Sequence, residues 1–154
     1  MKEFIQSIFQ SAVFKEQAAR KLYVNLSNRT TNDLIKQLFL RLAAEESVHE
    51  NLFKKMNPDI LNLVNKAPLE NLNLLNNLTS NELIDYDKED INNALDYAIT
   101  QEQFAIDDYK MLLNHLDFGE NRKAVQEIVI QETRHKNLLQ KTKLEFNGND
   151  WKKL

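Results

Sequence analysis

A set of residues between positions 12 and 52 of this sequence recurs, in the same spacing, between positions 98 and 138. A shift of 86 residues superposes apolar, aromatic and ionisable residues: Ala12 on Ala98, Glu16 on Glu102, Gln17 on Gln103, Ala19 on Ala105, Tyr23 on Tyr109, Leu26 on Leu112, Glu46 on Glu132, His49 on His135, and Leu52 on Leu138. We interpret this repeat as the internal duplication of a helical hairpin. The chain is therefore expected to fold as two similar hairpins packed together.

The scarcity of glycine and proline indicates long helices. The 154 residues include only two of each, and both residue types punctuate β-structure. Apolar residues at a spacing near 3.6 predict four helices, at residues 3–28, 32–56, 88–116 and 121–146. Thr31 or Asn32 is expected to cap the second helix. Gly119 is expected to end the third helix in the left-handed conformation that glycine accepts.

Residues 57–87 form the one long connection in this prediction. A structureless segment of this length is uncommon in a compact domain, but its leucines make it apolar enough to lie against a surface, with a short helix expected within it. A four-helix bundle with one long crossover between its two hairpins requires such a segment. A simple up-down-up-down bundle would carry it only as an inserted flap. We therefore predict an all-α four-helix bundle, a single domain over residues 1–154, with one long crossover connection between helices 2 and 3.

The repeated ionisable residues are candidate metal ligands. They are Glu16, Glu46, His49, Glu102, Glu132 and His135. Glu46 and His49 are three residues apart, so they share one face of a helix, and the second motif repeats this spacing. At ~1.5 Å rise per residue, Glu16 and Glu46 both lie roughly 21–24 Å from the turn between their helices. Two packed hairpins would therefore bring four carboxylates and two imidazoles together at mid-bundle.

The charge of this set favours metal binding. Four glutamates and two neutral histidines carry four negative charges, which two divalent ions would cancel; without metal, the carboxylates would repel one another and take up protons. Oxygen and nitrogen donors without thiolate suit iron or manganese, with zinc able to occupy the site adventitiously. The alternative is that these residues form an ordinary solvated stripe, which would make the register of the repeat a coincidence.

The motifs that carry a family resemblance are EQAARKLY, EESVHE, EQFAIDDY and ETRH, which contain the six candidate ligands. Over nearly its whole length, the chain resembles the ferritin-like di-iron carboxylate proteins, specifically their rubrerythrin-like branch. The resemblance implies a centre of two iron ions with Glu46 and Glu132 as bridging ligands and Glu16 and Glu102 as terminal ones. It also implies a non-haem di-iron oxidoreductase, commonly a homodimer, that reduces hydrogen peroxide or dioxygen or oxidises ferrous iron.

Four further residues are expected to support the ligands. In the family that the chain resembles, tyrosines placed like Tyr23 and Tyr109 hydrogen-bond near the ligands, although packing alone would also account for aromatic residues here. Metal-bound histidines need an acceptor for their second ring N–H. Glu45 is expected to face His135, and Gln131 is expected to face His49. Of the remaining polar residues, His115 is expected to cap a helix end rather than bind metal, and Glu50 is expected to face solvent.

The chain also departs from rubrerythrin proper. Ala105 stands where rubrerythrin carries an additional glutamate, and Ser47 stands where bacterioferritin places a haem-ligating methionine. The chain has no cysteine, so it holds no cysteine-ligated iron domain. Electrons are therefore expected to come from another protein, such as a rubredoxin-type donor.

Composition narrows the remaining function classes. A net charge of −3 gives no electrostatic basis for binding nucleic acid or an anionic membrane. The sequence contains no apolar run of 18 residues, so no transmembrane helix is predicted. We expect a cytoplasmic protein. The main alternative function is an iron-storage protein that assembles into a larger ferritin-like oligomer. A substrate oxygenase and a bundle that binds metal only for its structure are further alternatives.

Overall fold

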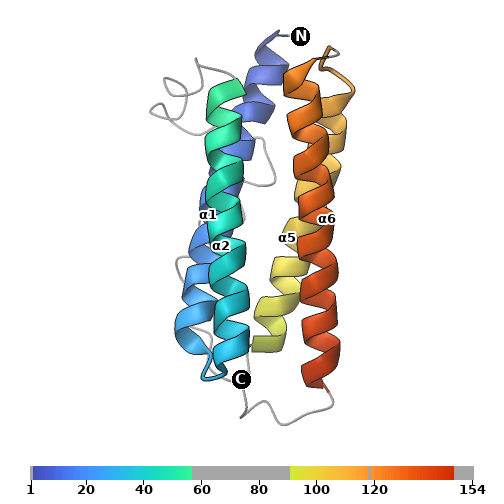
Figure 1. The fold of residues 1–154 in the computed structure, drawn as a ribbon. Coiled ribbons are helices and arrows are strands. Elements are labelled where there is room, and N and C mark those ends of the chain that lie inside the picture. The colour runs from blue at the N-terminus through green and yellow to red at the C-terminus, as the bar shows by residue number, and fades with distance from the viewer. Residues whose placement is uncertain (1, 57–90, 118, 148–154) are drawn as a thin grey trace.

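Four α-helices make up the described part of the chain, which covers residues 2–56, 91–117 and 119–147 of a computed structural model. They are α1 (Lys2–Arg29), α2 (Asp33–Met56), α5 (Ile91–Leu113) and α6 (Glu120–Asn147). Helices α1 and α2 form one antiparallel hairpin and α5 and α6 form the other, and the hairpins meet where α1 lies against α5 and α2 against α6 (Figure 1). The predicted all-α four-helix bundle is confirmed.

The order of the helices is that of a bundle with one crossover. Helix α2 ends at one end of the bundle and α5 begins at the other, so these two helices run in the same direction (Figure 1). The expected short helix within residues 57–87 and the expected start of the third helix at residue 88 lie outside the described residues.

The start of α2 is set by the side chain that caps it. The Oδ1 atom of Asn32 accepts hydrogen bonds from the backbone N–H groups of Leu34 (3.0 Å) and Ile35 (3.2 Å). These bonds satisfy donors that have no partner within the helix. Of the two capping residues that the sequence offers, Asn32 is the one that caps α2.

The prediction that Gly119 ends the third helix is wrong. Helix α5 ends at Leu113, and Gly119 instead precedes α6, where its carbonyl accepts a hydrogen bond from Lys123 N–H at 3.1 Å. Its φ of +153° is one that other residues rarely adopt. The guanidinium of Arg122 donates to the carbonyls of Leu113 and Leu116, so a side chain from the next helix satisfies the end of α5.

The apolar core consists of two clusters, one nearer each inter-helix turn. The first-turn cluster contains Ala19, Leu22, Tyr23, Leu26, Ile35, Phe39, Leu42, Ala43, Ala94, Leu95, Ala98 and Leu139. The second-turn cluster contains Ile8, Phe9, Ala12, Val13, Phe53, Ala105, Ile106, Tyr109, Leu112, Val125, Ile128 and Val129. The repeat relates the two clusters, since a shift of 86 residues carries Leu26 onto Leu112 and Leu42 onto Ile128. Between the clusters lies a layer of buried ionisable side chains.

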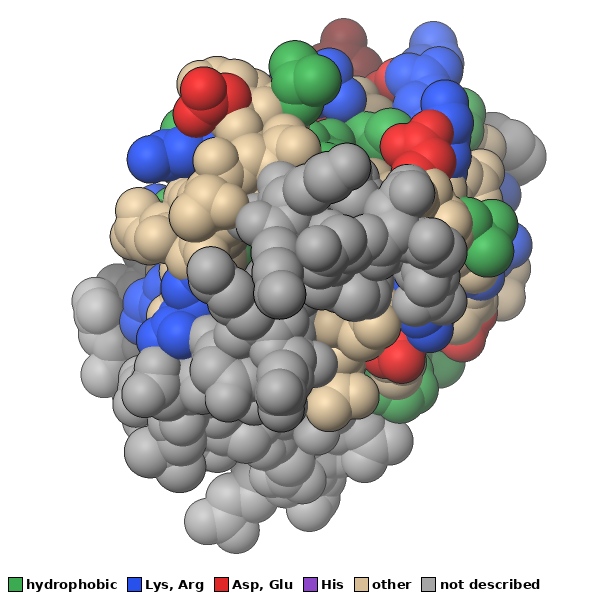
Figure 2. Space-filling model, turned by 90° about the horizontal axis from the view of Figure 1, so that it is seen from below, with side chains coloured by type: hydrophobic (Ala, Val, Ile, Leu, Met, Phe, Trp, Pro, Cys, Tyr) green, Lys and Arg blue, Asp and Glu red, His purple; other side chains and the backbone are tan. Residues whose placement is uncertain are grey.

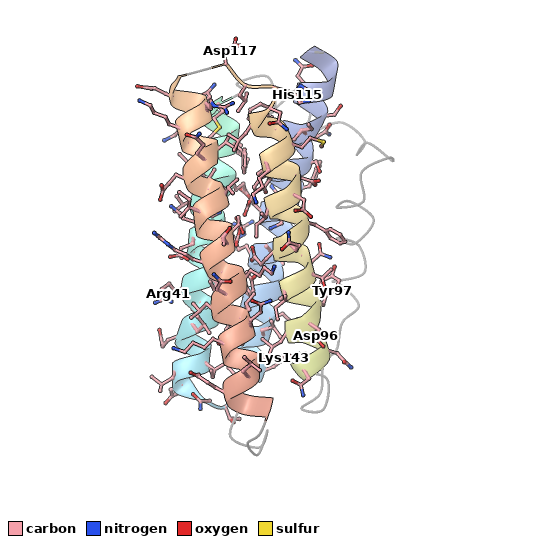
Figure 3. All side chains as sticks on the ribbon, turned by 90° about the vertical axis from the view of Figure 1, so that its right-hand side faces the viewer. Arg41, Asp96, Tyr97, His115, Asp117 and Lys143 are labelled. Atoms are coloured by element: carbon pink, nitrogen blue, oxygen red, sulfur yellow. The ribbon has the colours of Figure 1, made fainter. Side chains whose placement is uncertain are left out.

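Charged side chains lie on the outside of the bundle, beside polar and apolar ones (Figure 2). On the face shown in Figure 2, basic and acidic side chains lie among one another over the coloured part of the surface. Near the end where α5 begins, Lys143 of α6 forms an ion pair with Asp96 of α5 (Figure 3). Among the described helices, none has the length and apolar character needed to cross a membrane.

Candidate metal centre

The six predicted ligands meet in the buried layer between the two apolar clusters. Each of the six residues is at most 3% exposed. The first helix of each hairpin contributes one glutamate, and the second contributes a glutamate and a histidine. The residues are Glu16 from α1, Glu46 and His49 from α2, Glu102 from α5, and Glu132 and His135 from α6. The spacing of three residues in each Glu-x-x-His motif places both side chains on the inward face of one helix.

The ligand atoms form two overlapping groups. The first group consists of Glu16, Glu46, His49 and Glu132, and the second consists of Glu46, Glu102, Glu132 and His135. Within each group, one ligand atom per residue lies within 4.8 Å of all the others. Glu46 and Glu132 belong to both groups, so these two carboxylates are positioned to contact two ions at once. This is the arrangement expected of bridging ligands.

His49 contacts two residues of the opposite hairpin. Its Nδ1 donates to Glu132 Oε1 at 2.7 Å, and its Nε2 donates to Gln131 Oε1 at 2.6 Å. The ring is therefore oriented with Nδ1 toward the carboxylates and Nε2 toward the outside of the layer. The contact with Gln131 is the one expected from the sequence, and the part that Gln131 plays in metal binding stays a prediction.

His135 makes the same contacts in the other half of the repeat. Its Nδ1 donates to Glu46 Oε1 at 2.9 Å, and its Nε2 donates to Glu45 Oε2 at 2.6 Å. The rings of His135 and His49 are nearly parallel, with centroids 5.8 Å apart and 17° between their planes. Each histidine thus contacts the residue that precedes, in the opposite hairpin, the glutamate shared by both ligand groups, and its Nδ1 faces the carboxylates.

Two buried tyrosines donate hydrogen bonds to Glu16 and Glu102 across the interface between the two hairpins. The hydroxyl of Tyr109 donates to Glu16 Oε1 at 2.6 Å, and the hydroxyl of Tyr23 donates to Glu102 Oε1. Both tyrosines are at most 1% exposed. Each phenol therefore satisfies its own buried O–H and fixes one oxygen of a carboxylate.

Burial and mutual repulsion shift the proton affinity of the carboxylates. Burial, followed by the charge of Glu46, raises the pKa of Glu16 from 4.5 to about 7. Burial and the charge of Glu132 likewise raise the pKa of Glu102. For Glu132, burial and the charge of Glu16 act upward, but Lys15 and nearby hydrogen bonds act more strongly, so its pKa is lowered. The carboxylates of the metal-free layer therefore differ in their readiness to hold protons.

The pKa of both histidines is raised in the metal-free protein. Burial lowers the pKa of His49 and of His135, but hydrogen bonds to the glutamates raise both by more, so the net shift is upward. In the imidazolium form both ring nitrogens donate, which matches the oxygen atoms found beside them. Metal binding at Nδ1 requires that proton to leave.

A test of fit comes from buried atoms that lack partners. Within the described residues, one oxygen of each carboxylate in the layer has no hydrogen-bond partner: Oε2 of Glu16, of Glu46, of Glu102 and of Glu132. A buried acceptor without a partner is costly, and native proteins contain few of them. Four such oxygens in one layer, beside two histidine Nδ1 atoms, match the donors that a pair of divalent ions would require.

Sequence reasoning missed Lys15, which lines the same layer. Lys15 is 1% exposed, and its Nζ lies 3.8 Å from Glu132 Oε2 and 3.9 Å from Glu102 Oε2. The signal was present, because Lys15 precedes Ala19 and Leu22 by four and seven residues on the buried face of α1. A lysine in a chain with 20 basic residues does not stand out until that face is known to be buried.

The expectation that Glu50 faces solvent is wrong. Glu50 is 7% exposed because it follows Glu46 by four residues and so lies on the same face of α2. Lys54 donates to its Oε2 at 3.0 Å, and Arg20 lies 3.7 Å from its Oε1. His115 lies in the turn after α5, near the end of the bundle and outside both ligand groups (Figure 3).

The fold and the site together define a class of protein. A four-helix bundle with one buried glutamate from each of two helices, and Glu-x-x-His from each of the other two, is the arrangement of the ferritin-like carboxylate proteins. The family model described as Rubrerythrin matches residues 7–143. This chain belongs to the rubrerythrin family. Comparison with curated proteins and with solved structures finds no match.

Proposed function

We propose that this protein is a non-haem di-iron oxidoreductase that reduces hydrogen peroxide or dioxygen, or oxidises ferrous iron. The observation that carries the proposal is the pair of overlapping ligand groups, in which each of the four carboxylates has one oxygen without a hydrogen-bond partner among the described residues. Membership of the rubrerythrin family supports the same conclusion.

Two ions would be held by residues from all four helices. We expect Glu16 and His49 at the first position, Glu102 and His135 at the second, and Glu46 and Glu132 between them. Since the four carboxylates carry four negative charges, two divalent ions neutralise the ligand set when the histidines are neutral. Iron fits this set of oxygen and nitrogen donors, as manganese does.

When bound, two ferrous ions supply the two electrons that, with two protons, convert one hydrogen peroxide to two waters. The chain orients the ligands through hydrogen bonds that lie outside the ligand set. Tyr109 donates a hydrogen bond to one oxygen of Glu16, and Tyr23 donates one to an oxygen of Glu102. The other oxygen of each glutamate is therefore left for the site. The apolar clusters above and below the layer limit the access of water.

A separate electron donor is part of the proposal. The chain has no cysteine, so it cannot bind a cysteine-ligated iron of its own. We expect the donor to be a rubredoxin-type protein, and we expect the protein to act as a homodimer. A light-scattering measurement tests the second point, because a 24-subunit shell would support iron storage instead.

The activity can be tested by loading metal-free protein with ferrous iron under anaerobic conditions and mixing it with hydrogen peroxide in a stopped-flow instrument. We expect two irons per chain and a rise in ferric absorbance with peroxide. Glu46→Ala should stop iron loading while circular dichroism remains helical, and the matched surface change Glu145→Ala should behave as wild type. If wild-type iron stays ferrous, the proposed redox activity is wrong. If Glu46→Ala still binds two irons, the proposed ligand set is wrong.

A further inference from the structure

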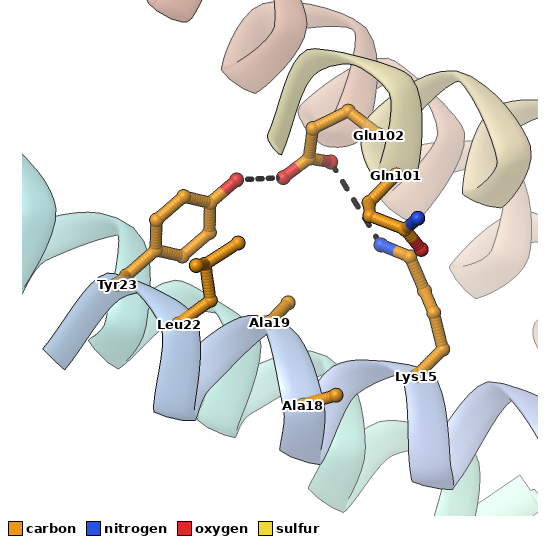
Figure 4. A pocket seen from close by; sticks show the side chains of 7 residues that line it. All are labelled: Lys15, Ala18, Ala19, Leu22, Tyr23, Gln101 and Glu102. Carbon is orange, nitrogen blue, oxygen red and sulfur yellow. Dashed lines mark hydrogen bonds and ion pairs between the residues drawn. The ribbon is translucent and has the colours of Figure 1, made fainter. Parts of the chain in front are cut away.

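Lys15 is a buried basic residue beside the six predicted ligands, and apolar packing alone does not account for a charged side chain there. The ammonium of Lys15 lies near the second ligand group, beside Gln101 and Glu102 (Figure 4). Its Nζ atom has no hydrogen-bond partner within the described residues, and its contacts are the two ion pairs at 3.8 and 3.9 Å. A buried ammonium of this kind is retained only where negative charge surrounds it.

The two ion pairs place the Lys15 ammonium beside two of the four carboxylates, and the ligand groups of the described residues contain no lysine or arginine. Opposite charges at this distance favour the charged form of a lysine. Lys15 therefore adds one positive charge to the layer. With four carboxylates, two divalent ions and neutral histidines, the metal-loaded layer would carry one positive charge in excess.

That charge breaks the symmetry between the two halves of the repeat. A shift of 86 residues carries Lys15 onto Gln101, which is buried but neutral. The ion pairs of the described residues join Lys15 to Glu102, which belongs only to the second ligand group, and to Glu132, which both groups share. None of these ion pairs joins Lys15 to Glu16 or His49. The cation therefore lies closer to one metal position than to the other.

We propose that Lys15 makes the two metal positions unequal, so that the position of Glu16 and His49 fills first and the position of Glu102 and His135 fills second and more weakly. The proposal rests on the two-metal centre of the proposed function and not on the reaction carried out there. Repulsion between an ammonium and a divalent ion falls with distance and is weakly screened inside a protein. The position nearer to Lys15 therefore has the lower affinity.

The matched substitutions are Lys15→Gln and Lys15→Met. The first places the side chain of Gln101 at both repeat-related positions, and the second removes the charge while keeping a long apolar stem. Lys21→Gln is the control, because it removes one positive charge from an exposed site on the same helix. Circular dichroism confirms that each variant is folded before metal is added.

Cobalt(II) is the probe, since it reports its coordination through absorbance and its location through anomalous scattering. Metal-free protein is titrated with cobalt(II), and crystals are grown with one equivalent. For wild type and Lys21→Gln we expect two steps, with the first cobalt at Glu16 and His49. For both Lys15 variants we expect the ratio of the two dissociation constants to fall by at least about tenfold, equal to ~1.4 kcal/mol, and the first cobalt to occupy both positions.

Two results would overturn the role of Lys15: a wild-type crystal whose single cobalt lies at Glu102 and His135 or divides equally, or Lys15 variants with the wild-type ratio. Because the wild-type crystal needs no variant, the test stands even if a substitution prevents folding. A wild-type protein that binds fewer than two cobalt ions would instead refute the two-metal centre itself. A centre that binds two cobalt ions in the expected order, but whose iron does not react with peroxide, would refute only the proposed reaction.

Discussion

Replacing Glu16 with glutamine should stabilise the metal-free protein at alkaline pH while it impairs metal binding. The Tyr109 hydroxyl donates to Glu16 Oε1, and the amide oxygen of glutamine can accept the same bond. The other carboxylate oxygen of Glu16 has no hydrogen-bond partner and lies 3.6 Å from His49 Nδ1, and in the variant an amide N–H would stand there and could donate to Glu46. Glu16→Gln therefore imitates the protonated form of Glu16.

The magnitude follows from the proton affinity of Glu16. Burial and the charge of Glu46 raise its pKa from 4.5 to about 7, a difference of about 2.5, and each unit corresponds to ~1.36 kcal/mol. A glutamate whose pKa is raised in the folded state contributes stability below pH 4.5 that is lost as the pH rises through about 7. Wild type should therefore lose up to about 3 kcal/mol of unfolding free energy between pH 4 and 8 through this group, and Glu16→Gln should not.

The assay is thermal and urea unfolding with a chelator present, followed by circular dichroism. We expect Glu16→Gln to match wild type near pH 4.5 and to unfold about 6–12 °C higher at pH 8. The control is Glu145→Gln, which alters an exposed ion pair with Lys141 and should change stability by less than ~0.5 kcal/mol. If metal-free Glu16→Gln is less stable than wild type at pH 8, the carboxylate is stabilised by its surroundings and the reasoning from repulsion is refuted.

Three other changes probe the same layer and its apolar boundary. Tyr109→Phe leaves Glu16 Oε1 without its donor, so it should cost about 1–3 kcal/mol in urea unfolding; unchanged stability would show that this hydrogen bond contributes nothing. Phe53→Ala removes a fully buried ring whose centroid lies 4.9 Å from that of Tyr109, and should cost about 3–5 kcal/mol by the same measurement; a loss below ~1 kcal/mol would indicate that the site collapses around the change. Loading two divalent ions at pH 7 in weakly buffered solution should release at least about two protons, from His49 and His135 and from the share of Glu16 that is protonated at this pH, and release of none would mean that these groups hold no proton before metal binds.

The fold was predictable because its determinants are local and repeated. Helical spacing of apolar residues placed the four helices, with the ends of α1, α2 and α6 at most one residue from the observed bounds. The 86-residue repeat placed the six ionisable residues at one level, since they lie near the middle of their helices and so meet at mid-bundle although the two turns are at opposite ends (Figure 1). The end of α5 was predicted three residues too late, because the cap that ends it comes from Arg122 of the next helix.

The composition of the centre was determined by the sequence alone, and its internal contacts were decided by the tertiary structure. The identity of the four glutamates and two histidines follows from spacing along single helices, which the chain encodes within a few residues. The roles of Lys15 and Glu50 depend on which face of a helix is covered by another helix, and that is a property of the packed bundle. The pKa shifts of Glu16, His49 and His135 likewise arise from burial and from side chains of other helices, which come together only in the packed bundle.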